Sequence, residues 1–126
     1  MYKYGTNRCK YLIINAKNFL HRKVKVVAKD YYGAIADHTK AIELDPDYAS
    51  AYYNRGIAKG NLKEYNSSIA DYTQAIELKP DYATAYSNRG IQKENLGDLR
   101  GACADWRKAA SLGHSNSAKW VRNQCN

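Results

Sequence analysis

The chain has little of what marks several common classes of protein. Its 126 residues include only two prolines, eight glycines and a single phenylalanine. No glycine-rich loop follows a predicted strand, so the sequence has no phosphate cradle of the usual nucleotide-binding kind. The longest apolar run near the N-terminus, Tyr11 to Ile14, is too short for a membrane span or a signal-peptide core. We therefore expect a soluble domain without a membrane segment, located in the cytoplasm.

Cysteine is also scarce. Cys9, Cys103 and Cys125 are odd in number, widely spaced and without a CxxC pairing. This spacing suggests neither a disulfide framework nor a zinc site, and a reducing compartment is the default for such a chain. We expect no metal and no cofactor, and we expect Cys103 to be a small core residue.

A catalytic constellation is missing as well. An enzyme needs an acid, a base or a nucleophile that converge on one site, whereas His21, His38 and His114 are isolated in the sequence. In the repeat described below, Tyr72 and Trp106 occupy the positions equivalent to His38. This equivalence favours a packing role for the His38 side chain. The sequence therefore predicts a protein that is not an enzyme.

Acidic residues are rare in one part of the chain only. Residues 1–30 hold eight Lys or Arg and one acid, while residues 31–126 hold twelve against eleven, which together give the net charge of +8. The basic balance thus belongs to an N-terminal segment and not to the remainder of the fold.

A repeat of 34 residues dominates what is present. The stretch from Ile69 to Leu96 is identical to the stretch from Ile35 to Leu62 at 21 of 28 positions. A fixed period of this length with a helix-turn-helix pattern is typical of a stacking supersecondary unit. Pro46 and Pro80 interrupt the pattern at equivalent places, because proline cannot continue a helix.

Apolar positions at three- and four-residue steps predict a series of helices. We expect them over Tyr31 to Leu44, Ala49 to Leu62, Tyr65 to Leu78, Tyr82 or Ala83 to Leu96, and Leu99 to Leu112. A last helix capped by Ser115 or Asn116 is expected to run through Trp120 and to cover the end of the stack, with Trp120 on Trp106 or its neighbours.

Two glycines in the middle of predicted helices indicate close crossings. Gly56 and Gly90 are equivalent by the repeat, and glycine within a helix costs roughly 1 kcal/mol relative to alanine. We expect the next helix to cross at these two points. Gly113 is expected to end its helix in a left-handed conformation.

The repeat unit resembles the tetratricopeptide repeat. The positions that carry the resemblance are Tyr52, Gly56, Tyr72, Ala75 and Pro80 in one unit, and Tyr86, Gly90, Ala102, Trp106 and Ala109 in the next. The resemblance implies an all-α fold: an α-α superhelix of antiparallel helix pairs, closed here by a C-terminal capping helix. We expect two parts, a basic and irregular segment over residues 1–30 and the helical repeat domain over residues 31–126.

The resemblance also implies a function in protein–protein interaction. In this family the first helices of successive units line a concave groove, and an asparagine at the place of Asn54 and Asn88 holds the backbone of a bound peptide. An amide suits this task because it carries both a donor and an acceptor. The alternative is that asparagine merely occupies an exposed helix position. The predicted partner-binding residues are Tyr53, Asn54, Ile57, Ser87, Asn88 and Ile91.

Basic pairs repeat one unit apart, Arg55 with Lys59 and Arg89 with Lys93. They could meet an acidic partner, but we favour a structural role in which their charged ends pair with acids such as Asp71 or Asp105. One subtype of the family grips the carboxylate end of chaperone tails. Its third unit needs Lys and Arg where this chain has Thr84 and Asn88, so we do not predict such binding.

Residues 1–30 allow three interpretations. Their charges alternate with tyrosines, a composition that binds nucleic acid or another acidic surface. The segment could equally cover the apolar face of the helix that begins at Tyr31, or form a homodimer contact within an oligomerisation module. We favour the cover or dimer contact, because no nucleic-acid-binding motif accompanies the charge.

Overall fold

The computed structural model describes residues 30–126, so nearly all of the basic segment predicted over residues 1–30 lies outside the described residues. Every regular element among residues 30–126 is a helix. After the helix of residues 30–44 come α2 (Ala49–Asn61), α3 (Tyr65–Leu78), α4 (Ala83–Asn95), α5 (Leu99–Ser111) and α6 (Ser115–Gln124). The predicted helices are confirmed to within a residue or two, except that the last one continues beyond Trp120 to Gln124.

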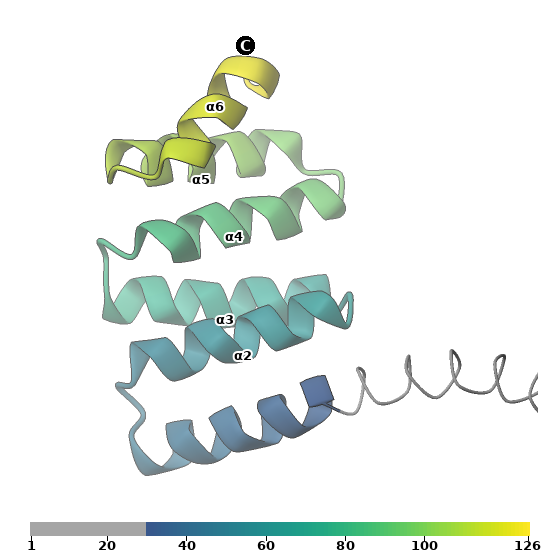
Figure 1. Cartoon of the computed structure of the whole chain (residues 1–126), viewed down its shortest axis with the longest axis vertical. Helices are drawn as coiled ribbons and strands as arrows, with labels where there is room; N and C mark the ends of the chain where they lie inside the picture. The colour runs from purple at the N-terminus through teal and green to yellow at the C-terminus, as the bar shows by residue number, and fades with distance from the viewer. Residues whose placement is uncertain (1–29) are drawn as a thin grey trace, which may run out of the picture. The chain divides into compact units, whose positions relative to one another are not determined.

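The helices stack in the order of the chain. Figure 1 shows them one above another from residues 30–44 to α6, each running back against the one before it. The close contacts are those of α2 with α3, α3 with α4, α4 with α5, and α5 with α6. Gly33–Asn126 form one compact unit. This is the all-α superhelix of antiparallel helix pairs that the repeat predicts, with α6 as its C-terminal cap.

Three of the helices are followed by a residue with left-handed backbone, and two of these residues are one period apart. Gly97 has a φ of 85° after α4, and Gly113 has a φ of 96° after α5. Lys63, one period before Gly97, has a φ of 63° after α2 although it carries a side chain. Left-handed backbone costs roughly 1 kcal/mol for such a residue, and the repeat geometry imposes it here. The left-handed end predicted at Gly113 is confirmed.

Large aromatic side chains lie against glycines where paired helices cross. Tyr72 and Trp106 are each 1% exposed. A β-carbon added at Gly56 would lie 2.9 Å from a ring carbon of Tyr72, and one added at Gly90 would lie 2.5 Å from Nε1 of Trp106. Real β-carbons do not approach other atoms this closely, so the ring of the second helix requires glycine in the first. The predicted crossings at both glycines are confirmed.

Replacing Gly90 by alanine is expected to lower the free energy of unfolding by about 1 kcal/mol. The added methyl group meets the indole of Trp106, and overpacking a core costs typically 1–3 kcal/mol, which exceeds the roughly 1 kcal/mol gained in helix propensity. Urea unfolding followed by circular dichroism measures the change.

Gly33 provides the matched control for this substitution. It also lies in a helix, but a β-carbon added there meets no atom of residues 30–126 within 4 Å. Gly33→Ala should therefore leave the protein as stable or make it more stable, by up to about 1 kcal/mol. A Gly90→Ala variant that gained stability in the same way would contradict the crossing argument.

The last helix closes the stack through aromatic and hydroxyl contacts. The ring centroids of Trp120 and Trp106 are 5.3 Å apart, as the sequence predicted. Ser117, which is fully buried, donates from Oγ to Oγ of Ser87 at 3.0 Å. The predicted cap was wrong: His114 is the N-cap residue, and its Nδ1 accepts a hydrogen bond from the backbone N–H of Ser117 at 3.2 Å. An imidazole nitrogen of His114 therefore accepts the capping hydrogen bond that was predicted for Ser115 or Asn116.

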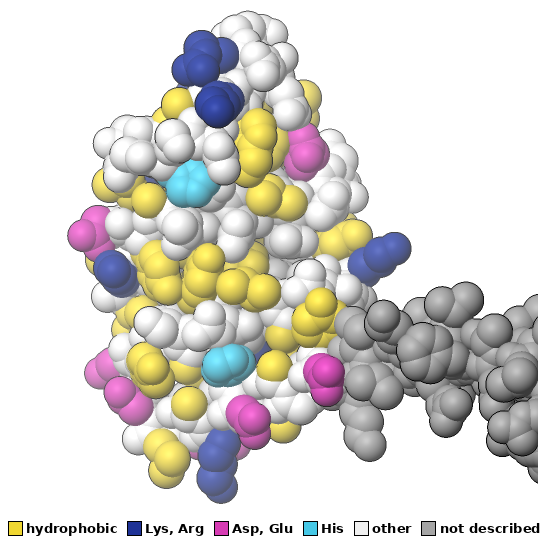
Figure 2. Space-filling model, in the orientation of Figure 1, with side chains coloured by type: hydrophobic (Ala, Val, Ile, Leu, Met, Phe, Trp, Pro, Cys, Tyr) yellow, Lys and Arg dark blue, Asp and Glu magenta, His cyan; other side chains and the backbone are white. Residues whose placement is uncertain are grey.

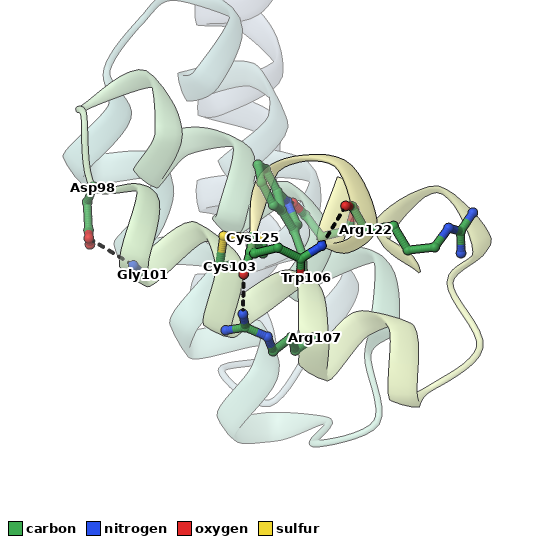
Figure 3. Close-up of a disulfide and its surroundings, with 9 residues drawn as sticks. Asp98, Gly101, Cys103, Trp106, Arg107, Arg122 and Cys125 are labelled. Carbon is green, nitrogen blue, oxygen red and sulfur yellow. Dashed lines mark hydrogen bonds between the residues drawn. A yellow bond between two sulfur atoms is a disulfide. The ribbon is translucent and has the colours of Figure 1, made fainter. Parts of the chain in front are cut away.

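A disulfide joins α5 to the end of α6. Cys103 and Cys125 are bonded, with their α-carbons 5.6 Å apart, and Nη2 of Arg107 donates to the carbonyl of Cys125 at 2.7 Å (Figure 3). The expectation that the cysteines suggest no disulfide was wrong. The two cysteines are 22 residues apart in the sequence, and the fold brings them together because α6 packs back against α5. Cys103 is nevertheless a buried core residue, as predicted. The expectation of a reducing compartment depends on the cysteines being unpaired, and the disulfide removes the basis for this expectation.

Candidate functional site

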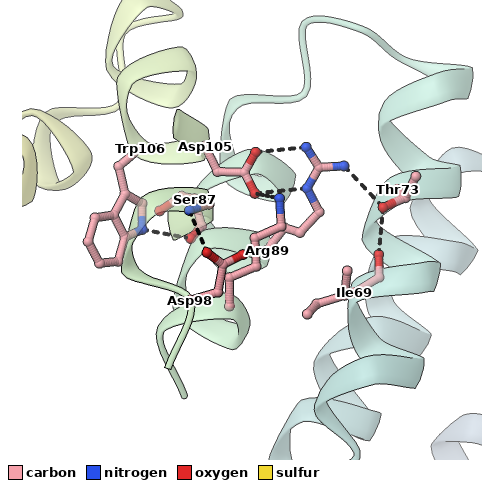
Figure 4. A network of polar contacts seen from close by, with 9 residues as sticks. Ile69, Thr73, Ser87, Arg89, Asp98, Asp105 and Trp106 are labelled. Carbon is pink, nitrogen blue, oxygen red and sulfur yellow. Dashed lines mark hydrogen bonds and ion pairs between the residues drawn. The ribbon is translucent and has the colours of Figure 1, made fainter. Parts of the chain in front are cut away.

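An arginine in each complete repeat links three helices. The guanidinium of Arg89 on α4 forms two hydrogen bonds with the carboxylate of Asp105 on α5, at 2.7 and 2.9 Å. Its Nη1 also donates to Oγ1 of Thr73 on α3 at 3.0 Å, and the Thr73 hydroxyl donates to the carbonyl of Ile69 (Figure 4). A bidentate pair of this kind is geometrically specific as well as strong. It fixes α4 against the second helices on both of its sides.

The same network recurs one period earlier. Arg55 forms two hydrogen bonds of 2.8 Å with Asp71, and its Nη1 donates to Thr39 at 3.0 Å. The hydrogen bond with Asp71 is the main reason that the pKa of Arg55 lies above its ordinary value, although burial acts in the opposite direction. Lys59 completes the network, with Nζ 3.0 Å from Asp71. Lys93 lies at the same distance from Asp105.

These networks turn the repeated basic residues inward. The side chains of Asp71 and Asp105 are only 6% and 5% exposed, so the charges that neutralise them are held inside the helix layers. The structural role favoured for the basic pairs is confirmed. On the face shown in Figure 2, hydrophobic side chains gather in patches across the stacked helices, and Lys and Arg lie mainly at the margins and at the α6 end.

A pocket of about 450 Å³ opens between α2 and α4. Its lining residues are Ile57, Gly60, Asn61, Lys63, Tyr65, Tyr72, Asn88, Ile91, Gln92 and Asn95. Helices α2 and α4 are the first helices of successive repeats, and the aromatic rings come from α3 between them. A concave site of this volume is in the range that binds a small ligand or a side chain of a partner.

The repeat itself builds two walls of this pocket. Ile57 and Ile91 are one period apart, and so are Asn61 and Asn95. Each pair therefore presents the same chemistry from two neighbouring first helices. Tyr72 contributes a nearly inaccessible side chain to the lining, and burial raises its pKa to about 12, while the neighbouring Ser68 and Asn88 act in the opposite direction. Its hydroxyl thus stays protonated and able to donate throughout the physiological range.

Comparison with known families and structures agrees with this architecture. A family model described as "Tetratricopeptide repeat" matches residues 49–82, and a second, described as "TPR repeat", matches residues 28–63. The solved structure titled "Second TPR of Spaghetti (RPAP3) bound to HSP90 peptide SRMEEVD" is 33% identical, with a TM-score of 0.64, and the match covers 65% of this chain and 76% of that one. The chain belongs to the tetratricopeptide repeat family.

Two further tetratricopeptide structures resemble the chain over more of its length. The first such domain of Spaghetti, also bound to the HSP90 peptide SRMEEVD, is 27% identical with a TM-score of 0.71 and covers 89% of this chain and 87% of its own. The tetratricopeptide domain of Arabidopsis OM64 is 29% identical with a TM-score of 0.69, covering 75% and 83%. Comparison with curated proteins gives no match.

Three of the residues predicted for the tetratricopeptide groove line the pocket, namely Ile57, Asn88 and Ile91. Tyr53 lies beside them, because its hydroxyl accepts a hydrogen bond from Nδ2 of Asn88 at 3.1 Å. That bond leaves Asn88 with a second N–H and a carbonyl oxygen to offer. Asn54 is exposed on α2 and does not line the pocket.

The structure separates Ser87 from the other predicted residues. Ser87 is 1% exposed, its hydroxyl accepts from Ser117, and its carbonyl accepts from Nε1 of Trp106 at 3.2 Å. Helix α6 therefore lies over it, and no partner reaches it in this arrangement. The equivalent residue of the preceding tetratricopeptide unit, Tyr53, remains partly exposed because α6 covers only the last unit.

Two aromatic side chains, one from α2 and one from the start of α4, stack beside the site. The rings of Tyr53 and Tyr82 are stacked with centroids 4.8 Å apart, and Nζ of Lys79 lies 4.8 Å from the centroid of Tyr82. Burial raises the pKa of Tyr82. The stack places a flat, amphipathic surface beside Asn88.

Sequence reasoning missed several pocket residues, above all Gln92. One signal was available, because the two repeat copies differ at this point: the position of Gln92 is Ala58 in the preceding unit, and Glu94 corresponds to Gly60. Of these residues, Gly60 on α2 lies against Gln92 on α4, and both line the pocket between the units. The contribution of Tyr65 and Tyr72 comes from α3, which the resemblance did not include in the groove.

Within residues 30–126, no group of three or more His, Cys, Asp or Glu side chains is placed to hold a metal ion. None of the helices in that part of the chain is both long and apolar enough to span a bilayer.

Proposed function

We propose that this protein is a noncatalytic protein-interaction scaffold that docks an extended peptide segment in the groove between α2 and α4. The observation that carries the proposal is the pocket in which Ile57, Ile91 and Asn88 converge from successive first helices. Apolar walls take up side chains of a peptide, while an amide pairs with its backbone. Tyr53 and Asn54 would extend the contact surface along α2.

Two related structures support peptide docking. Both Spaghetti domains are bound to a peptide, SRMEEVD, and their folds match this chain with TM-scores of 0.71 and 0.64. The peptide of this chain should differ in charge, because its four repeated cations are engaged by Asp71 and Asp105. An acidic tail would find Lys63 as the one cation lining the pocket. We therefore propose a partner segment that is held by amide and apolar contacts.

Substitution of Asn54 and Asn88 together by alanine tests this function. Peptides are first selected against the full chain from a library of random linear peptides, and their affinities are then measured by fluorescence polarisation. We expect the double variant to bind at least about tenfold more weakly, because loss of hydrogen bonds to a ligand costs about 1–3 kcal/mol. Urea unfolding should show a loss of only about 1 kcal/mol, since Asn54 is exposed and Asn88 gives up one hydrogen bond, to Tyr53.

A matched control is Asn123→Ala, which removes an exposed amide on α6, outside the groove. It should leave peptide affinity unchanged. The peptide SRMEEVD serves as an acidic comparison and should bind more weakly than the selected peptides. Selected peptides that bind the double variant as tightly as the natural chain would remove the groove proposal.

The division into a basic segment over residues 1–30 and a helical domain over residues 31–126 remains our proposal. Nucleic-acid binding, homodimer contact and cover by residues 1–30 concern a segment outside the described residues. They stay predictions, and the groove proposal depends on none of them.

A further inference from the structure

Gln92 is a buried polar side chain with an unused hydrogen-bonding group. It is 9% exposed, and its Oε1 finds no donor among the residues that the structure describes. Buried polar groups are nearly always paired, and each exception calls for an explanation. The equivalent residue of the preceding repeat, Ala58, is 3% exposed, so the fold itself does not require an amide at this position.

The amide end of Gln92 lies at the pocket. Its Nε2 is 3.0 Å from the point where a β-carbon of Gly60 would lie, and both residues belong to the pocket lining. The terminal torsion of glutamine is broad and roughly two-fold, so a rotation about it exchanges the places of the enclosed Oε1 and of Nε2 without moving the stem. A ligand group in the pocket therefore pairs with whichever of these two atoms faces it.

The remaining lining groups restrict the chemistry of that ligand. Asn61, Asn88 and Asn95 bring three more amides, and Lys63 brings the one formal charge of the lining. No carboxylate is present to receive a cation. Ile57 and Ile91 face the same space from the two first helices, where they suit the methylene stem of a side chain.

We propose that this pocket is a subsite for a glutamine side chain of the bound peptide, an inference that rests on the proposed function. A carboxamide carries a donor and an acceptor, so it pairs with the Gln92 amide in either orientation of that amide. Asn88 and Asn95 can pair with its remaining positions. Its two methylene groups lie between Ile57 and Ile91.

Other side chains satisfy this site less well. A glutamate accepts from the amides and from Lys63, but it pairs with the Gln92 amide in only one of its two orientations, because it has no donor for Oε1. A lysine brings a charge that has no carboxylate partner in the lining and that Lys63 repels, which makes its burial costly. A leucine fills the volume while leaving the amides unpaired. The subsite therefore selects glutamine over a side chain that is acidic, basic or purely apolar.

The test uses blocked amino acids as probes of the full chain labelled with nitrogen-15. N-acetylglutamine methylamide is titrated against it by NMR, in parallel with the glutamate, lysine and leucine analogues. We expect the glutamine probe to shift the side-chain N–H₂ resonances of Gln92 and Asn88, with half-saturation at a concentration at least about fivefold lower than for the other three. Equal or tighter binding of another analogue would overturn the subsite.

Gln92→Leu is the decisive variant, because it removes the amide and retains similar volume. Loss of an unpaired acceptor should leave stability unchanged or improved, and the fivefold preference for glutamine should disappear. If this variant does not fold, Gln92→Ala replaces it, since Ala58 occupies the equivalent position. A preference that survives the substitution would refute the role of Gln92.

The outcomes also separate this inference from the proposed function. Selected peptides that bind through Asn88 but lack glutamine, with affinities unchanged by Gln92→Leu, would leave the groove function standing and remove the subsite. Failure of all peptides to depend on Asn54 and Asn88 would remove both.

Discussion

Replacing Asp105 by alanine is expected to lower the free energy of unfolding by about 3 to 5 kcal/mol. The carboxylate is 5% exposed and neutralises both Arg89 and Lys93, whose side chains are 16% and 23% exposed. Removing one partner of a buried ion pair leaves the remaining charge without its neutralising partner, and this costs about 3–5 kcal/mol. Urea unfolding followed by circular dichroism and tryptophan fluorescence measures the change.

Asp37 offers a control for this substitution within the same chain. It lies one period before Asp71 and two before Asp105, but it is exposed and forms no ion pair among the described residues. Asp37→Ala should change stability by less than about 0.5 kcal/mol. In a double-mutant cycle, Arg89→Ala combined with Asp105→Ala should cost less than the sum of the two single changes by about 0.5–3 kcal/mol. Additive effects, or equal losses for Asp37 and Asp105, would show that the network does not stabilise the stack.

The features that the sequence predicted well are those that repeat. The period of 34 residues aligns Gly56 with Gly90 and Tyr72 with Trp106, so the sequence gives two examples of each structural position in the same context. The turns at Pro46 and Pro80 follow from local backbone chemistry. The sequence alone therefore predicts the helix bounds, the helix crossings at the two glycines and the pairing of the basic residues with acids.

Features that depend on the end of the repeat could not be inferred in this way. Ser87 occupies a groove position by alignment, yet α6 covers it, because the last unit has a cap where another repeat would otherwise stand. The Cys103–Cys125 pair likewise has no counterpart in the earlier unit. The pocket at Gln92 depends on a position at which the two repeat copies differ. A prediction that relies on the similarity of the copies does not detect it.

Opening the Cys103–Cys125 disulfide is expected to lower the free energy of unfolding by about 3 kcal/mol. The bond closes a loop over a sequence separation of 22 residues, and loop-closure entropy for such a length corresponds to roughly 3 kcal/mol at 25 °C. The loss should be concentrated in α6, which has 10 residues and is too short to be a stable helix without docking. Cys125→Ser, or a reducing agent added to the natural chain, should have the same effect.

The location of the effect follows from what holds α6 at its two ends. Ser117 and Trp120 bind the first half of the helix to Ser87 and Trp106, whereas its last turn is held by the disulfide and by the bond from Arg107 to Cys125. Hydrogen exchange should therefore accelerate most in the last turn of α6 and least in α2 and α3. Asn123→Ala, an exposed change in the same helix, is the control and should change stability by less than about 0.5 kcal/mol. A natural chain whose stability does not respond to the reducing agent would contradict a stabilising disulfide, and two free thiols at these positions would exclude the bond itself.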